Sequence, residues 1–277
     1  MDSLVDSLER CPDQASILLI GSTGAGKSAT INHLLSTAKL NESAKTGSSK
    51  PETRVTSEFV LTVEDHGNDG HSKLTLGIID TPGFNDRSDV KQDTHNSFSI
   101  KRFFQTHPKY LAPCYPNLIF LLVSANDDRI EGSSSDLANT MRALKDLGVV
   151  DQRHPNIVAV LTHCCSVSDK NLSKWEATMQ EKKEIISHNI CQVLGIDEAP
   201  VVLLENNHDD LELERNGDFT LLPNEESQPK NLYNACEKLL EKNKDRYGLI
   251  AFKACLVDPK TKKHCKVALH KVIAKDA

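Results

Sequence analysis

Residues 21–28, with the sequence GSTGAGKS, constrain this chain more than any other segment, because they fit the P-loop pattern G-x-x-x-x-G-K-[ST]. The segment directly follows residues 16–20, an apolar run of strand length, as the pattern requires. The backbone N–H groups of such a loop surround phosphate oxygens, and the loop opens into a helix whose N-terminus favours an anion. Residues 21–28 therefore predict a nucleotide-binding P-loop fold.

Each position of this loop has an expected contact with a nucleotide. Lys27 would reach the β- and γ-phosphates, and Ser28 would bind Mg²⁺. A chance glycine-rich turn is the alternative, but four fixed residues in a strand-to-helix context favour the functional interpretation. The other predicted nucleotide contacts in this segment are Ser22, Thr23, Gly24, Ala25, Gly26 and Ala29.

A second motif, Asp80-Thr-Pro-Gly83, follows an apolar segment at residues 74–79. An acidic residue at the carboxyl end of a buried strand holds Mg²⁺ in P-loop NTPases, which predicts Asp80 as a metal ligand. Gly83 would let its backbone N–H approach the γ-phosphate without an intervening side chain, and we group it with Lys27 as a catalytic residue. An Asp-Thr-Pro-Gly turn alone means little, but after a P-loop it indicates a nucleotide site.

The polar segment 36–53 lies between the two motifs, where a nucleotide-dependent switch is expected. Thr53 and Thr56 both lie near the start of the next strand, and either could close on Mg²⁺ and the γ-phosphate. We assign Thr56 to the site as a metal ligand and catalytic residue, while the choice between the two stays open at this point.

Apolar runs alternate with helical patterns along the chain, which predicts an α/β fold. We expect a three-layer P-loop NTPase G domain with a mostly parallel sheet and one antiparallel strand. Ligands of such sheets bind beyond the carboxyl ends of the strands, so the P-loop, Asp80, His163 and Asn206 should meet there. Strands are expected at residues 16–20, 55–63, 74–79, 118–124, 157–161 and 200–204, helices at 29–35, 98–104, 136–147, 171–194 and 232–243, and a loop at 208–230.

These motifs resemble those of translation-factor-class GTPases, and more closely those of the septin and AIG1/Toc group, over residues 15–248. The fourth motif position, residues 162–165, reads Thr-His-Cys-Cys and lacks the Lys and Asp of the common pattern. A Thr-His pair occurs at this place in AIG1- and Toc-like proteins, with the His ring against the base. Residues 205–207, Glu-Asn-Asn, resemble the Asn-Asn element with which the same group contacts guanine.

The resemblance implies GTP and GDP as ligands, Mg²⁺ as cofactor, and pairing with a second copy of the chain across the nucleotide face. It also implies that the ring of His163 lies on the base and that Asn206 or Asn207 contacts it. His163 could instead be bonded to backbone, and the two Asn residues could be turn formers. Because Cys165 cannot supply the carboxylate acceptor that guanine requires, guanine specificity is less secure than nucleotide binding.

Phe84 stands directly after the glycine of the second motif, where Ras-like proteins carry the Gln that orients the attacking water. Because an apolar ring cannot hold a water molecule, we expect slow intrinsic GTP hydrolysis that a second subunit accelerates. Arg129, which loosely resembles an AIG1 motif, is a candidate to act across such a pair. The alternative is a nucleotide-binding interaction module without significant hydrolysis. An ATP-using kinase is disfavoured because no basic lid is visible.

The remaining composition argues against several other classes of protein. No apolar run approaches the roughly 20 residues of a membrane-spanning helix, and the first ten residues lack a signal-peptide pattern. The eight cysteines show no zinc-binding spacing, so a cytoplasmic protein with reduced thiols is expected. The net charge of −6 gives no reason to expect a nucleic-acid partner.

We expect three parts in the chain: an N-terminal extension at residues 1–14, the G domain at 15–248, and a basic C-terminal tail at 249–277. The segment from residue 251 onward contains seven Lys and two Asp, a net charge of +5. Such a tail could contact an acidic membrane surface, but a solvated, frayed terminus is the favoured interpretation.

Overall fold

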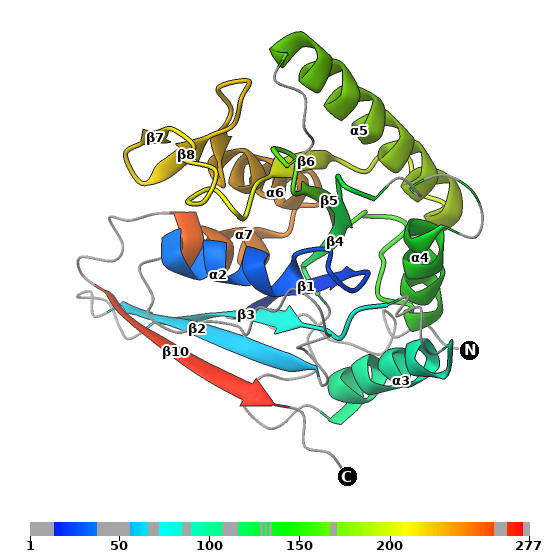
Figure 1. The fold of residues 1–277 in the computed structure, drawn as a ribbon. Helices are drawn as coiled ribbons and strands as arrows, with labels where there is room; N and C mark the ends of the chain where they lie inside the picture. The colour runs from blue at the N-terminus through cyan, green and yellow to red at the C-terminus, as the bar shows by residue number, and fades with distance from the viewer. Residues whose placement is uncertain are drawn as a thin grey trace.

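A seven-stranded sheet forms the centre of the computed structural model, which describes residues 14–37, 56–65, 72–84, 90–106, 116–127, 130, 132, 135–166, 171–257 and 265–273 (Figure 1). The strand order is β10-β2-β3-β1-β4-β5-β6. These strands are β1 (Gln14–Gly21), β2 (Ser57–Asp65), β3 (Ser72–Asp80), β4 (Leu118–Ser124), β5 (Ile157–Thr162), β6 (Val201–Leu204) and β10 (Cys265–Ile273). The helices are α2 (Lys27–Thr37), α3 (Val90–Thr106), α4 (Asp136–Leu147), α5 (Leu172–Leu194), α6 (Lys230–Lys242) and α7 (Arg246–Phe252), and α7 continues as the π-helix η1 (Lys253–Val257).

The strand directions confirm the predicted fold class. β1 is parallel to both of its neighbours, β3 and β4, and the parallel arrangement continues through β5 to β6. β2 is antiparallel to β3 on one side and to β10 on the other. Within this sheet, β2 is therefore the one strand that runs opposite to the rest, as the α/β G-domain prediction requires.

Helices cover both faces of the sheet, which gives the predicted three layers (Figure 1). Side chains alternate between the two faces along a strand. In β1, Ile17 and Leu19 pack with α2, α6 and α7, whereas Leu18 and Ile20 pack with α3, α4 and α5. Because both faces are buried, the central strands are apolar almost throughout, and every side chain of β5 is buried.

The ends of α4 and α5 follow from local capping. The side chain of Ser135 accepts a hydrogen bond from the backbone N–H of Ala138, so Ser135 is the N-cap and the helix expected at residues 136–147 begins at Asp136. Asn171 caps α5 in the same way. Gly148 and Gly195 end the two helices with φ values of 65° and 69°.

The structure differs from the sequence expectation between β6 and α6. Residues 208–230 are not all loop, because they contain a small antiparallel sheet of β7 (Arg215–Asn216), β8 (Phe219–Leu221) and β9 (Ser227–Gln228). These strands have two or three residues each, which is too short for a hydrophobic alternation to be recognised in the sequence.

The C-terminal region also differs from the expected frayed tail. The side chains of Phe252 and Leu256 are buried in the core layer that contains α2 and α6. Asn117 donates a hydrogen bond of 2.7 Å to Asp245, which caps α7, and so joins this helix to the start of β4. β10 then pairs with β2 along its whole length. The expectation of a frayed tail was based on the number of basic residues and did not consider the apolar residues that place this segment on the sheet.

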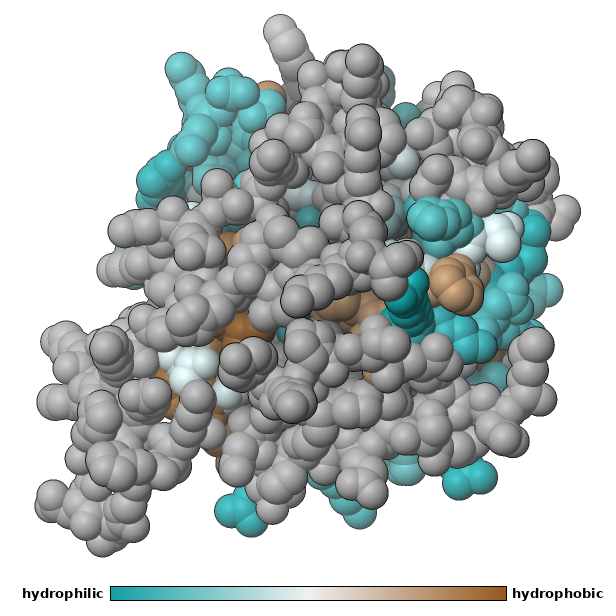
Figure 2. Space-filling model, turned by 90° about the horizontal axis from the view of Figure 1, so that it is seen from below, coloured by the Kyte–Doolittle hydropathy of each residue, from teal (hydrophilic) through white to brown (hydrophobic). Residues whose placement is uncertain are grey.

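No helix in the described part of the chain is long and apolar enough to cross a membrane. On the face shown in Figure 2, hydrophilic side chains of the described residues gather at the upper left and on the right, and apolar side chains show near the middle. Phe103 and Phe104 of α3 are buried as expected, but Phe98 of the same helix is 63% exposed and lies outside the core.

Candidate nucleotide-binding site

The carboxyl ends of the parallel strands bring the predicted site residues to one edge of the sheet. Leu19 pairs with Asp80, and Ser124 pairs with Thr162, which in turn pairs with Leu204. The P-loop, Asp80, His163 and Asn206 therefore follow strands that end at the same level, as predicted. We call the part built on β1, β2 and β3 the phosphate end, and the part built on residues 162–165 and 205–207 the base end.

Lys27 lies at the centre of the phosphate end. Its ammonium donates hydrogen bonds to the carbonyl oxygens of Gly21 and Ser22, at 3.0 and 2.9 Å. Burial lowers the pKa of Lys27 to about 8, against the opposing effect of the nearby Asp80 carboxylate. Gly26, with a φ of 85°, turns the loop into α2, which begins at Lys27. This is the strand-to-helix turn that the motif predicts.

Ser28 and Asp80 are joined directly. The Ser28 hydroxyl donates a hydrogen bond of 3.1 Å to Oδ2 of Asp80, which is buried. Thr56 precedes Ser57, the residue that pairs with Asp80, so Thr56 lies at the same edge of the sheet. Its hydroxyl is fully buried and has no hydrogen-bond partner among the described residues. Thr53, the alternative to Thr56, lies outside the described residues.

These oxygen atoms fit a magnesium ion. Mg²⁺ is bound through hydroxyl and carboxylate oxygens together with phosphate oxygens and water. Ser28, Asp80 and Thr56 offer two hydroxyls and one carboxylate at the phosphate end, and the buried Thr56 hydroxyl gains a partner if it binds the ion. When bound there, Mg²⁺ would neutralise phosphate charge.

The second motif is hydrogen-bonded to the P-loop through its backbone. The N–H of Thr23 donates to the carbonyl of Phe84 at 3.0 Å, and the N–H of Phe84 donates to the carbonyl of Gly21 at 3.1 Å. A Cβ atom on Gly83 would lie 2.4 Å from Oγ1 and 2.6 Å from Cα of Thr23, so this contact requires glycine. Asn96, which we did not predict, fixes the Gly83 carbonyl with a hydrogen bond of 2.8 Å.

The side chain of Phe84 is directed away from the site. It is 1% exposed and belongs to the core cluster that also contains α3 and α4. The expectation of an apolar ring beside the phosphates is therefore corrected, since position 84 contributes only backbone atoms to the site. The conclusion that this position offers no polar side chain to a water molecule stays the same.

His163 and Asn206 meet at the start of α2. A Cβ atom on Gly26 would lie 3.5 Å from Cε1 of His163 and 3.1 Å from Nδ2 of Asn206. Nδ2 of Asn206 donates to the hydroxyl of Thr30 at 3.0 Å. Thr162 donates to the carbonyl of Ala25 at 2.9 Å, which joins the base end to the P-loop.

The His163 ring is half-buried on a residue whose φ is 55°. Its Nδ1 atom lies 3.2 Å from the Thr162 hydroxyl and 3.3 Å from the Ser124 hydroxyl. Asn207 is exposed, and stacking of His163 on a base or contact of Asn206 or Asn207 with a base stays a prediction. Arg129 lies outside the described residues.

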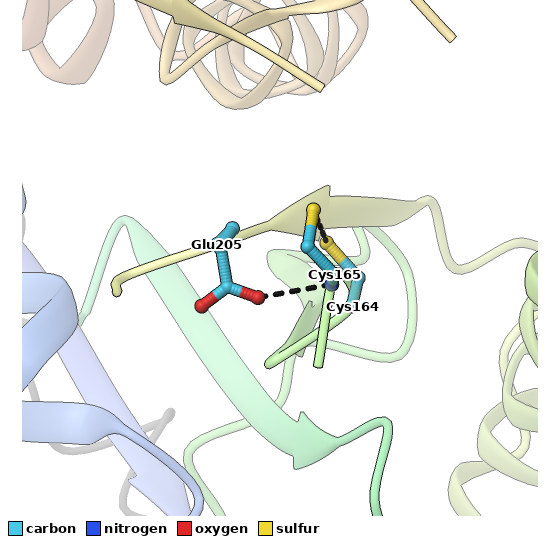
Figure 3. A group of neighbouring side chains, drawn as sticks. All are labelled: Cys164, Cys165 and Glu205. Atoms are coloured by element: carbon cyan, nitrogen blue, oxygen red, sulfur yellow. Dashed lines mark hydrogen bonds between the residues drawn. The ribbon is translucent and has the colours of Figure 1, made fainter. Parts of the chain in front are cut away.

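Glu205 is the residue of the base end whose role the sequence reasoning missed. Its carboxylate is fully buried and accepts hydrogen bonds from the backbone N–H groups of Cys165 and Asn207, each at 2.9 Å (Figure 3). Gln228 holds the Glu205 backbone through a pair of hydrogen bonds, at 2.6 and 3.2 Å. The signal was present, because Glu205 is an acidic residue at the carboxyl end of a buried strand: it directly follows β6, as Asp80 ends β3.

Comparison with known proteins agrees with this geometry. The family model described as septin matches residues 13–214. The translocase of chloroplast 101 of Physcomitrium patens is 29% identical over 217 residues, which are 76% of this chain and 21% of that protein. The cell division control protein 10 of Candida albicans is 22% identical over 188 residues, which are 64% of this chain and 49% of that protein. The chain thus spans about a fifth of the length of the chloroplast translocase.

Solved structures show the same fold. Toc33 of Arabidopsis thaliana in complex with GDP and Mg²⁺ matches with a TM-score of 0.57 at 19% identity, over 85% of this chain and 86% of that one. A structure from work on dimerisation and GTPase activity of the chloroplast translocon components atToc33 and psToc159 matches with a TM-score of 0.60 at 18% identity, over 85% of each chain.

Proposed function

Since this chain belongs to the septin family of P-loop GTPases, we propose that it binds GTP with Mg²⁺, hydrolyses it slowly to GDP, and acts as a nucleotide-dependent switch or assembly module. The observation that carries this proposal is the joined cluster of Lys27, Ser28 and Asp80 at one edge of the sheet. A P-loop kept only as a structural turn would not require the costly burial of a lysine and a carboxylate beside it.

Each residue of the phosphate end has a role in this proposal. The P-loop N–H groups and the Lys27 ammonium bind the phosphates and offset their charge. Gly83 directs its N–H toward the γ-phosphate, and the Asn96 side chain holds the peptide that follows it. Loss of the γ-phosphate removes this contact, which would release the second motif as a switch.

Slow hydrolysis follows from position 84. The attacking water must be oriented by a polar group, and the Phe84 side chain lies in the core instead. A second copy of the chain could supply the missing group across the nucleotide face. Dimerisation is important for the GTPase activity of the chloroplast translocon components atToc33 and psToc159, which supports the choice of a second copy as partner.

A nucleotide-binding interaction module without significant hydrolysis is the second candidate function. The same position of Phe84 favours it, since the buried Phe84 ring cannot orient a water molecule. The two functions share the binding step and differ only in turnover, so separate experiments address them.

Binding is tested by competition of GTP, GDP and ATP for the purified chain with Mg²⁺, alongside Lys27→Ala. We expect GTP and GDP to compete far better than ATP, and Lys27→Ala to lose at least about a hundredfold in GTP affinity because a buried charge contact with phosphate is removed. Undiminished binding by Lys27→Ala would show that the site is wrongly assigned. Equal competition by ATP would contradict the roles of His163 and Asn206.

Turnover is tested by single-turnover GTP hydrolysis over a dilution series. If a second copy completes the site, the rate constant rises with protein concentration and falls to a low plateau at high dilution. A fast rate that does not depend on concentration contradicts both slow intrinsic hydrolysis and completion by a second copy. Bound GTP that stays intact at every concentration favours the interaction module.

A further inference from the structure

Two neighbouring thiols and a buried carboxylate lie together within the base end. The Sγ atoms of Cys164 and Cys165 are 4.0 Å apart, and the ligand atoms of these two residues and of Glu205 all lie within 4.8 Å of one another (Figure 3). A turn closed by the hydrogen bond from the N–H of Ser166 to the carbonyl of His163 places both cysteines at its centre.

The environment of Glu205 is unusual for a carboxylate that carries only a structural role. It is 0% exposed, and no Lys, Arg or His in the described part of the chain forms an ion pair with it. Buried charges in proteins are paired or coordinate metals. Two backbone N–H groups use two of the roughly four lone-pair positions of the carboxylate, so it can still bind a cation.

We propose that Cys164, Cys165 and Glu205 form a binding site for a thiophilic divalent cation such as Zn²⁺. Two thiolates on one tetrahedral zinc, with Zn–S bonds of about 2.3 Å, stand about 3.8 Å apart. The sulfur atoms here, at 4.0 Å, are already at nearly that separation. The site has three protein ligands and an open fourth position, and the sulfur ligands favour zinc over magnesium or calcium.

The surroundings hold these ligands in place. Nε1 of Trp175 donates a hydrogen bond of 2.7 Å to the carbonyl of Cys164, which fixes the turn. The bonds from Cys165 and Asn207 orient the Glu205 carboxylate, as outer-shell hydrogen bonds orient ligands in metal sites. Cys164 is buried and Cys165 is half-buried, so the Cys165 side provides the route of entry.

The site stands apart from the proposed GTPase function, because none of its three ligands binds phosphate or Mg²⁺ in that proposal. Failure of one experiment therefore leaves the other intact. The motif spacing did not predict the site, since its third ligand is distant in sequence and reaches the cysteines only through the pairing of β5 with β6.

The test uses the full chain, reduced and stripped of metal, with Zn²⁺ alone titrated against a chromophoric zinc chelator. We expect one Zn²⁺ per chain that the double variant Cys164→Ser/Cys165→Ser no longer binds, and at least about tenfold weaker binding by Glu205→Gln. Cys191→Ser is the matched control, because Cys191 is also a free, half-buried cysteine but lies on α5 outside the cluster. It should bind as the unchanged chain does.

A second measurement needs no variant and remains decisive if one fails to fold. Zn²⁺ should protect Cys165, the half-buried member of the pair, from alkylation, as read by peptide mass spectrometry, while Cys191 reacts at the same rate with and without the ion. Equal alkylation of Cys165 in both conditions would overturn the proposal. So would a folded double variant, as judged by circular dichroism, that binds Zn²⁺ as tightly as the unchanged chain.

Discussion

At the phosphate end of the site, the contacts are made by two motifs, each of which is a short run of consecutive residues. Lys27 donates hydrogen bonds to the backbone of its own loop, and Ser28 of the first motif donates one to Asp80 of the second. At the base end, two loops that share no fixed-spacing motif are tied together by one carboxylate, that of Glu205. The phosphate end thus depends on backbone shape that a short motif encodes. The base end depends on a contact between Glu205 and Cys165, two residues that no recognised pair of motifs places together.

This difference predicts different responses to substitution. Backbone N–H groups and a lysine recognise phosphate, which every nucleoside triphosphate carries, so damage at the phosphate end should affect all nucleotides alike. The base end should control stability of its own two loops and the choice among bases.

The largest effect is expected for Glu205→Ala. The substitution leaves the N–H groups of Cys165 and Asn207, whose bonds to Glu205 are part-buried, without an acceptor. A buried donor without an acceptor costs about 1–3 kcal/mol, and a part-buried one costs less, so the free energy of unfolding should fall by about 2–3 kcal/mol in total. Glu205→Gln keeps one acceptor oxygen and should lose about half as much. The measurement is urea unfolding of the metal-free chain.

Glu198→Ala is the matched control for this experiment. Glu198 also carries a carboxylate near β6, but it is exposed and pairs with Lys242 at the surface. Its removal should change the free energy of unfolding by less than about 1 kcal/mol. If Glu205→Ala is no more destabilising than Glu198→Ala, the base-end loops are held by other contacts and the comparison fails.

A smaller effect is expected from pH at the phosphate end. The Lys27 pKa of about 8 means that the free protein loses this charge as pH rises through 8. Bound phosphates restore the charge, so binding takes up a proton and GTP affinity should fall about tenfold between about pH 7 and pH 9. Calorimetry at pH 9 in buffers of different ionisation enthalpy should show the uptake of about one proton.

The Lys27→Ala variant is the control for the pH profile, because its residual GTP affinity should not change over the same range. The sign for stability is opposite. The folded pKa lies below the value of 10.5 for an unperturbed lysine, so the Lys27 contribution to the free energy of unfolding rises with pH between about 8 and 10.5. A GTP affinity that is constant up to pH 9 would contradict the burial of a titrating lysine at this site.

The sequence predicted most of the fold because its signals were local. The P-loop, the apolar run of β4 and the helical pattern of α4 each depend on neighbouring residues, and the one antiparallel strand that we expected is β2. The core position of α7 and β10 escaped prediction because net charge says nothing about which apolar residues in a basic segment are buried.

The phosphate end could be predicted for the same reason, and the base end only in part. His163 and Asn206 were placed by their order along the chain, and the structure brings both to Gly26. The sequence reasoning looked for a carboxylate only within residues 162–165, so it did not connect Glu205 with Cys165. Glu205 directly follows β6 and contacts Cys165 only after β5 and β6 pair.

The smallest effect is expected for His163→Ala, which removes one ring from the base end. Loss of base stacking should weaken GTP binding about five- to tenfold, since one stacked base contributes about 1 kcal/mol or more. GDP binding should weaken by the same factor, because the ring is on the side of the base and not of the γ-phosphate. His163→Phe keeps a ring in place and should retain most of the affinity for both nucleotides. Equal losses in the Ala and Phe variants would mean that His163 acts through its Nδ1 contacts with Ser124 and Thr162 rather than by stacking. A change in the ratio of GTP affinity to GDP affinity would mean that the two ends of the site are not separate.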